Sequence, residues 1–192
     1  MQTWIWIVIA LCVVAIAAAV LAAMRQQRHR GRLRQTFGPE YDRTLGQHAN
    51  RRDAERELAG RYERRQSLAI RPLSVEHRQG FAQEWHDVQA RFVDTPADAV
   101  RDADSLLSRL MRERGYPVAD FDQRAVDVSV DHPRVVENYR TAHTISLRSA
   151  AGQASTEELR QAMVHYRSLF EDMLTDGGTA AEAAAPAARD SR

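Results

Sequence analysis

The sequence predicts an all-α protein with one N-terminal transmembrane helix, a charged juxtamembrane helix and a small bundle of four or five helices. Three observations support this prediction. The chain of 192 residues begins with a long apolar run. Further along, apolar residues recur every three or four positions, which is the period of an amphipathic helix. Only residues 126–130 alternate in the manner of a β-strand, and one short strand cannot form a sheet.

The predicted segments follow from changes in composition along the chain. We expect a transmembrane helix over residues 1–24, a basic juxtamembrane segment with a charged helix over 25–67 and a helical bundle over 68–176. The remaining residues, 177–192, are rich in Ala and contain no large apolar residue. Such a composition cannot bury enough apolar surface to fold, so we expect this tail to be disordered.

The apolar run extends from Trp4 to Met24, which is 21 residues without a charge. As a helix it would span about 31 Å, close to the roughly 30 Å of a bilayer's hydrocarbon core. A cleaved signal peptide has a basic start and a run of only about 7–15 apolar residues. Here Met1, Gln2 and Thr3 supply no side-chain charge, and the run is longer. A retained transmembrane helix therefore fits better than a signal peptide or a buried core helix.

Five arginines follow the apolar run with no acidic residue among them: Arg25, Arg28, Arg30, Arg32 and Arg34. An excess of arginine keeps its side of a membrane helix in the cytoplasm. The rest of the chain is therefore expected in the bacterial cytoplasm, attached to the cytoplasmic membrane by a single pass. These arginines would also contact anionic lipid headgroups, although stopping translocation needs no lipid contact.

Small residues in the apolar run, Ala15, Ala19 and Ala23, are spaced four apart. Such spacing allows two membrane helices to pack closely and would make the chain a homo-oligomer. The run is rich in Ala throughout, however, so the spacing also arises without any helix contact. The one cysteine, Cys12, lies in this run, which excludes an intrachain disulfide and a zinc site of the cysteine-rich kind.

Residues 37–66 are predicted to form one highly charged helix. Pro39 is suited to a first helical position, and Glu40 and Asp42 are suited to the first turn. The apolar stripe of this helix is thin. A thin stripe is typical of a solvated stalk or of the edge of a larger packing.

The bundle is predicted from its capping residues and stripes. Ser74 would cap a helix to about Val93, and Thr95 with Pro96 would start the next, which Gly115 would end. Shorter helices would start at Asp120 and at Asp131-His132-Pro133. The last helix would start at a capping box of Ser155 and Glu158 and end at Gly177-Gly178. The first and last stripes consist of Phe81, Trp85, Val88 and Phe92, and of Leu159, Ala162, Met163, Tyr166, Leu169, Phe170 and Met173.

Charge divides the chain into two parts. Residues 25–71 carry 13 Arg and 6 acidic residues, whereas residues 72–192 carry 14 Arg and 20 acidic residues. An acidic bundle is a poor ligand for nucleic acid, because phosphate contacts require a cationic surface. The bilayer is the nearer polyanion for the basic segment. The expected partners are the lipid bilayer and a protein, and not nucleic acid.

Several phrases of the sequence together resemble a family of uncharacterised bacterial proteins, common in actinobacteria, which have one N-terminal membrane helix. These phrases lie at residues 37–43, 84–94, 114–121, 127–140 and 161–167. The resemblance covers nearly the whole chain except the tail. It implies a bacterial membrane location and a helical soluble domain, and it implies no activity.

A search for catalytic motifs finds no metalloprotease or phosphate-loop pattern, no nucleophile elbow and no dinucleotide-binding glycine motif. No cofactor or metal site is expected. The remaining polar set comprises Glu84, His86, Asp87, Asp127, Asp131, His132, His143 and His165. Asp131, His132 and Arg134 form the most suggestive piece, because a carboxylate, an imidazole and a guanidinium would meet at a helix start, where backbone N–H groups bind anions. Asp131 or His132 would equally serve as an ordinary cap.

His143 and His165 lie on the predicted stripes of two different helices, next to tyrosines. Each is interpreted as a hydrogen-bonded histidine at the edge of the core, or alternatively as part of a ligand site. Three functions stay open at this point. The first is a membrane-anchored interaction or scaffold module without enzymatic activity. The second is a ligand-responsive sensor with a site at Asp131–Arg134 together with His143 or His165. The third is an enzyme without a recognisable motif.

Overall fold

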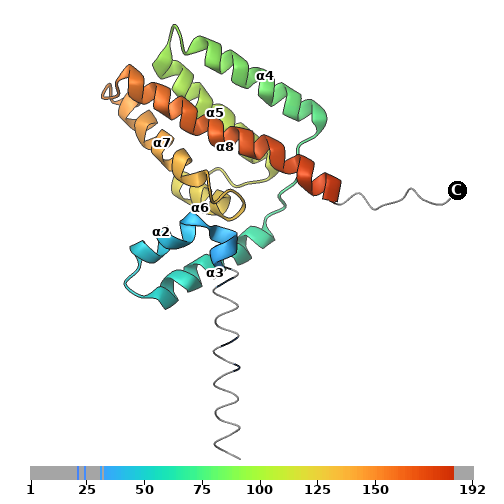
Figure 1. The fold of residues 1–192 in the computed structure, drawn as a ribbon. Helices are drawn as coiled ribbons and strands as arrows, with labels where there is room; N and C mark the ends of the chain where they lie inside the picture. The colour runs from blue at the N-terminus through green and yellow to red at the C-terminus, as the bar shows by residue number, and fades with distance from the viewer. Residues whose placement is uncertain (1–20, 22–23, 25–30, 32, 184–192) are drawn as a thin grey trace, which may run out of the picture. The chain divides into compact units, whose positions relative to one another are not determined.

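The computed structural model describes Leu21, Met24, Gly31 and residues 33–183, and it confirms the all-α prediction. Seven helices are bounded in this part of the chain, and it contains no strand: α2 (Pro39–Gln47), α3 (Arg51–Ser67), α4 (Val75–Arg91), α5 (Pro96–Arg114), α6 (Phe121–Asp131), α7 (Val136–Ala150) and α8 (Thr156–Ala183) (Figure 1). Residues 33–37, immediately before α2, are helical as well.

The predicted transmembrane helix lies outside the described residues, apart from Leu21 and Met24 at its end. Within the described part, no helix combines the length and the apolar character needed to cross a bilayer. Four of the five arginines that follow the apolar run also lie outside the described residues. The fifth, Arg34, is exposed and lies 3.8 Å from Asp42.

The chain forms two compact units, which divide between Ala59 and Gly60 within α3. In the first unit, the single charged helix predicted over residues 37–66 is wrong. The helix is interrupted, because His48 adopts an extended conformation that ends α2, and α3 begins only at Arg51. The interruption brings Tyr41 to Glu55, to which its hydroxyl donates a hydrogen bond of 3.1 Å. Among the described residues of this unit, the buried apolar side chains are Leu33, Phe37, Tyr41, Ala54 and Leu58.

The second unit is the helical bundle. Helix α8 packs against both α5 and α7, and α4 packs against α5 (Figure 1). The predicted stripe of α8 is buried along its whole length, and Trp85 of α4 stacks on Phe170 of α8 with ring centroids 4.7 Å apart. These contacts form one continuous apolar core. The apolar stripes therefore identified the core-facing sides of α4 and α8 correctly.

Most of the predicted caps are confirmed. The side chains of Ser74 and Asp120 accept hydrogen bonds from the backbone N–H groups of His77 and Gln123. Gly115 ends α5 with a φ of 96°, and an added Cβ there would lie 2.5 Å from the carbonyl oxygen of Ala69. Only glycine combines this left-handed conformation with such a close approach of two backbone segments. Thr95 precedes α5 as predicted, but its side chain makes no capping bond.

One segment and two helix boundaries differ from what the sequence pattern indicates. Residues 126–130, which alternate like a strand, lie within α6. Asp131 is the last residue of α6, and the next helix begins only at Val136. Helix α8 continues through Gly177 and Gly178 to Ala183, although we expected it to end at the glycines. Each glycine disfavours a helix by only about 1 kcal/mol relative to Ala, and the following alanines favour it. Residues 184–192 of the predicted tail lie outside the described residues.

The capping box at the start of α8 generates a prediction about pH. The Glu158 carboxylate accepts hydrogen bonds from the backbone N–H and the hydroxyl of Ser155 and pairs with Arg148. These contacts, the backbone bond first, lower the pKa of Glu158 from 4.5 to about 2. Because the folded-state pKa is lowered, the stabilisation is complete above the unfolded-state pKa and is lost as the pH falls towards about 2.

We therefore expect the difference in unfolding free energy between the wild type and Glu158→Gln to shrink between about pH 5 and about pH 2. Urea unfolding of the full chain in detergent, followed by circular dichroism across this range, measures it. Gln161→Glu, a change on the exposed side of the same helix, serves as a control for added or removed surface charge. A difference that does not vary with pH would show that the carboxylate does not cap α8.

Candidate functional site

The corner formed by Asp131, His132 and Arg134 lies at the end of a helix, and the predicted helix start at this position is wrong. His132 is the C-cap of α6, and its N–H donates to the carbonyl oxygen of Val128 at 2.9 Å. A helix end presents carbonyl oxygens, which repel anions, and not N–H groups. Pro133 explains the error, because proline is common both at the first position of a helix and just after its end.

Asp131 belongs instead to a joint between α3 and α6, which we call the α3–α6 joint and define as Arg64, Arg65, Asp127 and Asp131. Arg64 Nε donates to Asp127 Oδ1 at 2.8 Å, and Arg65 Nε donates to Asp131 Oδ2. The two carboxylates lie four residues apart and therefore on one face of α6. Two consecutive arginines at the end of α3 thus hold one face of α6.

Burial makes the α3–α6 joint costly to break. The Asp127 side chain is 1% exposed, and besides Arg64 it accepts a hydrogen bond of 3.0 Å from Gln123. A buried carboxylate that loses its cation keeps its desolvation cost. Tyr116 donates to Asp131 as well, and burial followed by the negative charge of Asp131 raises the pKa of Tyr116. The phenol therefore stays protonated and remains a donor.

The side chain of His132 has different surroundings from those of Asp131 and Arg134. Its side chain is completely buried, and its Nδ1 lies 2.7 Å from the Asp172 carboxylate of α8. Arg134, by contrast, is exposed and makes no hydrogen bond or ion pair with any other described residue. The three side chains of the predicted corner therefore face different surroundings and do not converge on one ligand position.

His143 lies in a second polar cluster, the Asp104 cluster, which we define as Asp104, Tyr139, His143 and Tyr166. The Tyr166 hydroxyl donates to Asp104 Oδ1 at 3.0 Å, and His143 Nδ1 lies 3.9 Å from the same oxygen. The imidazole of His143 stacks on Phe121 with ring centroids 3.6 Å apart. Burial first and Asp104 second raise the pKa values of Tyr139 and Tyr166, so both phenols stay protonated.

The Asp104 cluster is better described as a contact between helices than as a ligand site. Asp104 lies on α5, Tyr139 and His143 lie on α7, and Tyr166 lies on α8. The Tyr166 hydroxyl supplies the donor where these three helices meet, and Asp104 is the acceptor. The sequence pattern indicated His143 but not Asp104, because Asp104 follows the buried Ala103 and resembles an ordinary surface acid. His165, the other predicted histidine, is half-buried on α8 and has no side-chain hydrogen bond among the described residues.

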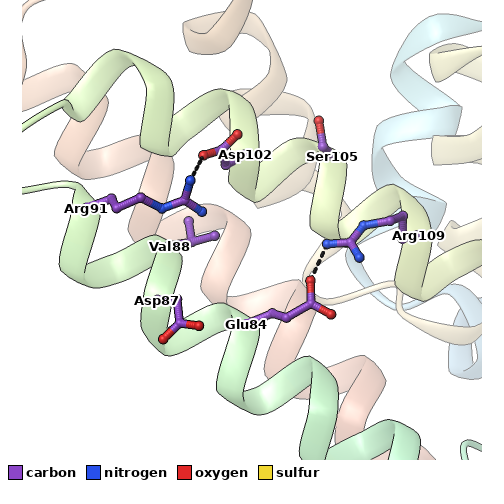
Figure 2. Close-up of a pocket in the computed structure, with 7 residues that line it drawn as sticks. All are labelled: Glu84, Asp87, Val88, Arg91, Asp102, Ser105 and Arg109. Carbon is purple, nitrogen blue, oxygen red and sulfur yellow. Dashed lines mark hydrogen bonds and ion pairs between the residues drawn. The ribbon is translucent and has the colours of Figure 1, made fainter.

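A groove between α4 and α5, the α4–α5 groove, has a volume of about 260 Å³ and is lined by Glu84, Asp87, Val88, Arg91, Asp102, Ser105 and Arg109. Figure 2 shows two ion pairs that link the helices on either side of Val88. One joins Arg91 to Asp102 at 2.6 Å, and the other joins Arg109 to Glu84. All four charged groups are at least one-third exposed, so each pair contributes only about 0–1 kcal/mol. His86 is exposed and does not line the groove.

A second groove, the α4–α8 groove, has a volume of about 180 Å³ and is more apolar. Its apolar lining consists of Phe92, the C-cap of α4, and of Met163 and Val164 on α8. Gln89, Arg160 and Arg167 complete it. None of these six residues belongs to the polar set of the sequence analysis. Phe92 and Met163 were predicted as stripe residues, and Val164 follows Met163 and widens the apolar face of α8.

Within the described part of the chain, no three His, Cys, Asp or Glu side chains are placed to hold one metal ion. No protein-family model matches this chain, and neither a curated protein nor a solved structure matches it. In the described part of the chain, the candidate site is therefore defined by geometry, through two interhelical polar clusters and two grooves along α4.

The α3–α6 joint generates the second prediction. Arg64→Ala should lower the free energy of unfolding by about 1–3 kcal/mol, because it leaves the buried Asp127 carboxylate without its cation. Arg134→Ala removes an exposed arginine nearby and should cost under about 0.5 kcal/mol. Denaturant unfolding of both variants measures the difference. Adding Asp127→Asn to Arg64→Ala should restore part of the loss. Equal effects of the two arginine substitutions would contradict a structural role for the joint.

Proposed function

We propose that this chain is a membrane-anchored helical interaction or scaffold module at the bacterial cytoplasmic membrane. The observation that carries the proposal is the separation of the polar set. Asp131 pairs with Arg65 and Tyr116, His132 pairs with Asp172, and His143 faces Asp104. Each contact joins two different elements of the bundle. Polar side chains with this distribution hold helices together and leave the outer helix faces to bind a partner.

The same observation weakens the hypothesis of a sensor at the Asp131–Arg134 corner. That sensor requires Asp131, His132 and Arg134 to act together with His143 or His165. The carboxylate and the imidazole are bonded to other helices, and Arg134 is exposed at the end of α6. A ligand at this position would have to displace contacts that stabilise the fold. A scaffold requires no such displacement.

The location is supported by the uncharged run over residues 4–24 and the five arginines that follow it. The resemblance to bacterial single-pass proteins points to the same location. With this anchor, the two units from residue 33 onward would lie on the cytoplasmic side, where the juxtamembrane arginines contact the bilayer. A homo-oligomer through Ala15, Ala19 and Ala23 is compatible with this arrangement but is not required by it.

The anchoring proposal predicts the result of a reporter fusion. Alkaline phosphatase fused after Arg192 should be inactive, and green fluorescent protein at the same position should fluoresce, because the arginines keep the C-terminal side in the cytoplasm. Replacing Arg25, Arg28, Arg30, Arg32 and Arg34 with Gln should reduce this bias. An active phosphatase fusion of the wild-type chain would overturn the orientation, and recovery of the chain in the soluble fraction would overturn the anchor.

The interaction proposal predicts that a tagged full-length chain, purified from detergent-solubilised membranes, carries one protein partner in stoichiometric amount. A tagged chain that ends at Ala59 keeps the apolar run and the basic segment but lacks the bundle, so it serves as the control. The partner should appear with the full chain and not with the control. Recovery of no stoichiometric partner under conditions that keep the bundle folded would contradict the scaffold proposal.

A further inference from the structure

The α4–α8 groove differs from the α4–α5 groove by its apolar side chains. Val164, in its lining, is 55% exposed, and Val93, directly after the lining residue Phe92, is 84% exposed. Met163 and Phe92 contribute further apolar surface from the two helices. An apolar groove rimmed by polar residues is typical of a protein-binding surface, whereas single exposed apolar residues are common everywhere. Leu147 on α7, which is 60% exposed, lines neither groove.

The charged residues of α8 have a definite order along this groove. Arg160 and Arg167 both line it and lie seven residues apart on α8, so their Cα atoms are about 10 Å apart along the helix axis. They pair with Glu157 and Glu171, which lie further out along α8 in both directions. The cations are therefore the inner charges and the carboxylates the outer ones. All four side chains are more than half exposed, and ion pairs this exposed are readily exchanged for others.

We propose that the α4–α8 groove binds an acidic amphipathic segment of a partner protein. One apolar side chain of that segment enters the cavity between Phe92, Met163 and Val164. Carboxylates on either side of it pair with Arg160 and Arg167. This inference rests on the proposed interaction function and names the surface and the kind of partner. Arginine is the cation best suited to this role, because its planar guanidinium can bind a carboxylate through two parallel hydrogen bonds.

Charge argues against a second copy of this chain as the occupant. In an antiparallel, two-fold symmetric pairing of α8 centred on Val164, a residue before Val164 in one copy lies beside a residue about equally far after Val164 in the other copy. Arg160 would then face Arg167 of the second copy, and Glu157 would face Glu171. Both contacts bring like charges together. An acidic segment of a different protein meets the two arginines without this repulsion.

The test uses two synthetic helical peptides and the full chain in nanodiscs of neutral phosphatidylcholine. The first peptide carries one Leu with Glu three positions before it and four positions after it, matching the spacing of the arginines around the cavity. The second peptide carries Lys at both positions. Fluorescence anisotropy should show that the Glu peptide binds at least tenfold more tightly than the Lys peptide. Empty nanodiscs provide the background.

The variants assign the binding to the groove. Val164→Glu should weaken binding of the Glu peptide at least tenfold, and Leu147→Glu, at an equally exposed apolar position on α7, should leave it unchanged. Arg160→Glu combined with Arg167→Glu should reverse the preference in favour of the Lys peptide. Arg160→Gln combined with Arg167→Gln should abolish the preference without adding repulsion along α8. Circular dichroism verifies that each variant is folded.

Three results would overturn the inference: equal binding of both peptides, equal effects of Val164→Glu and Leu147→Glu, and concentration-dependent self-association that Val164→Glu abolishes. The affinity purification separates this inference from the scaffold proposal. If the wild type and Val164→Glu recover the same partner equally well, the groove is wrong and the scaffold proposal stands. If the wild type recovers no partner, the scaffold proposal fails whatever the peptides show.

Discussion

Burial of the apolar stripe of α8 is the constraint on which the bundle depends. Leu159, Tyr166, Leu169, Phe170 and Met173 are all buried along this helix. No single neighbour covers the stripe, because α5 and α7 pack on different sides of α8 and Trp85 of α4 stacks on Phe170. The direction in which α5 and α7 turn their polar sides therefore follows from how they cover α8. Apolar burial of this kind is the largest favourable contribution to folding.

The polar clusters are consequences of this packing. When α5, α7 and α8 close on the apolar core, Asp104, His143 and Tyr166 come together at its edge. The end of α3 reaches α6 in the same way, and Arg64 and Arg65 meet two carboxylates that α6 places on one face. Hydrogen bonds of this kind add little net stability, but leaving one partner buried and alone is costly. The clusters therefore specify how the helices are arranged more than they strengthen the fold.

The grooves arise where coverage of the core is incomplete. Helix α4 leaves Val164 uncovered next to Phe92 and the buried Met163, and the groove between α4 and α8 follows from this gap. On the other side of α4, charged pairs with α5 span the α4–α5 groove, as Arg91 and Asp102 do. The two grooves along α4 thus have different chemistry: the α4–α8 groove is apolar and is flanked by arginines of α8, whereas ion pairs cross the α4–α5 groove. This difference makes the α4–α8 groove the more suitable surface for a protein partner.

Local features of the fold were determined by the sequence alone. The caps at Ser74, Asp120 and Ser155, the turn at Gly115 and the stripes of α4 and α8 were all predicted correctly, because each depends on residues within one or two helical turns. Features that depend on distant residues were not predictable. Asp131 and Pro133 are residue types typical of a helix start. Asp131 is instead the last residue of α6, where it accepts hydrogen bonds from Arg65 and Tyr116, which lie far away in the chain.

The same distinction between local patterns and contacts with distant residues applies to the candidate site. Sequence patterns selected His132 and His143 as polar residues of interest, but they could not identify Asp172 and Asp104 as the acids that face them. They also missed the α4–α8 groove, since Phe92 and Val164 are 72 positions apart and each alone resembles an ordinary stripe residue. A spacing of three or four residues determines which side of a helix is apolar. Only the packing of whole helices decides which apolar residues stay uncovered and which charges meet, because these depend on crossing geometry that no local pattern contains.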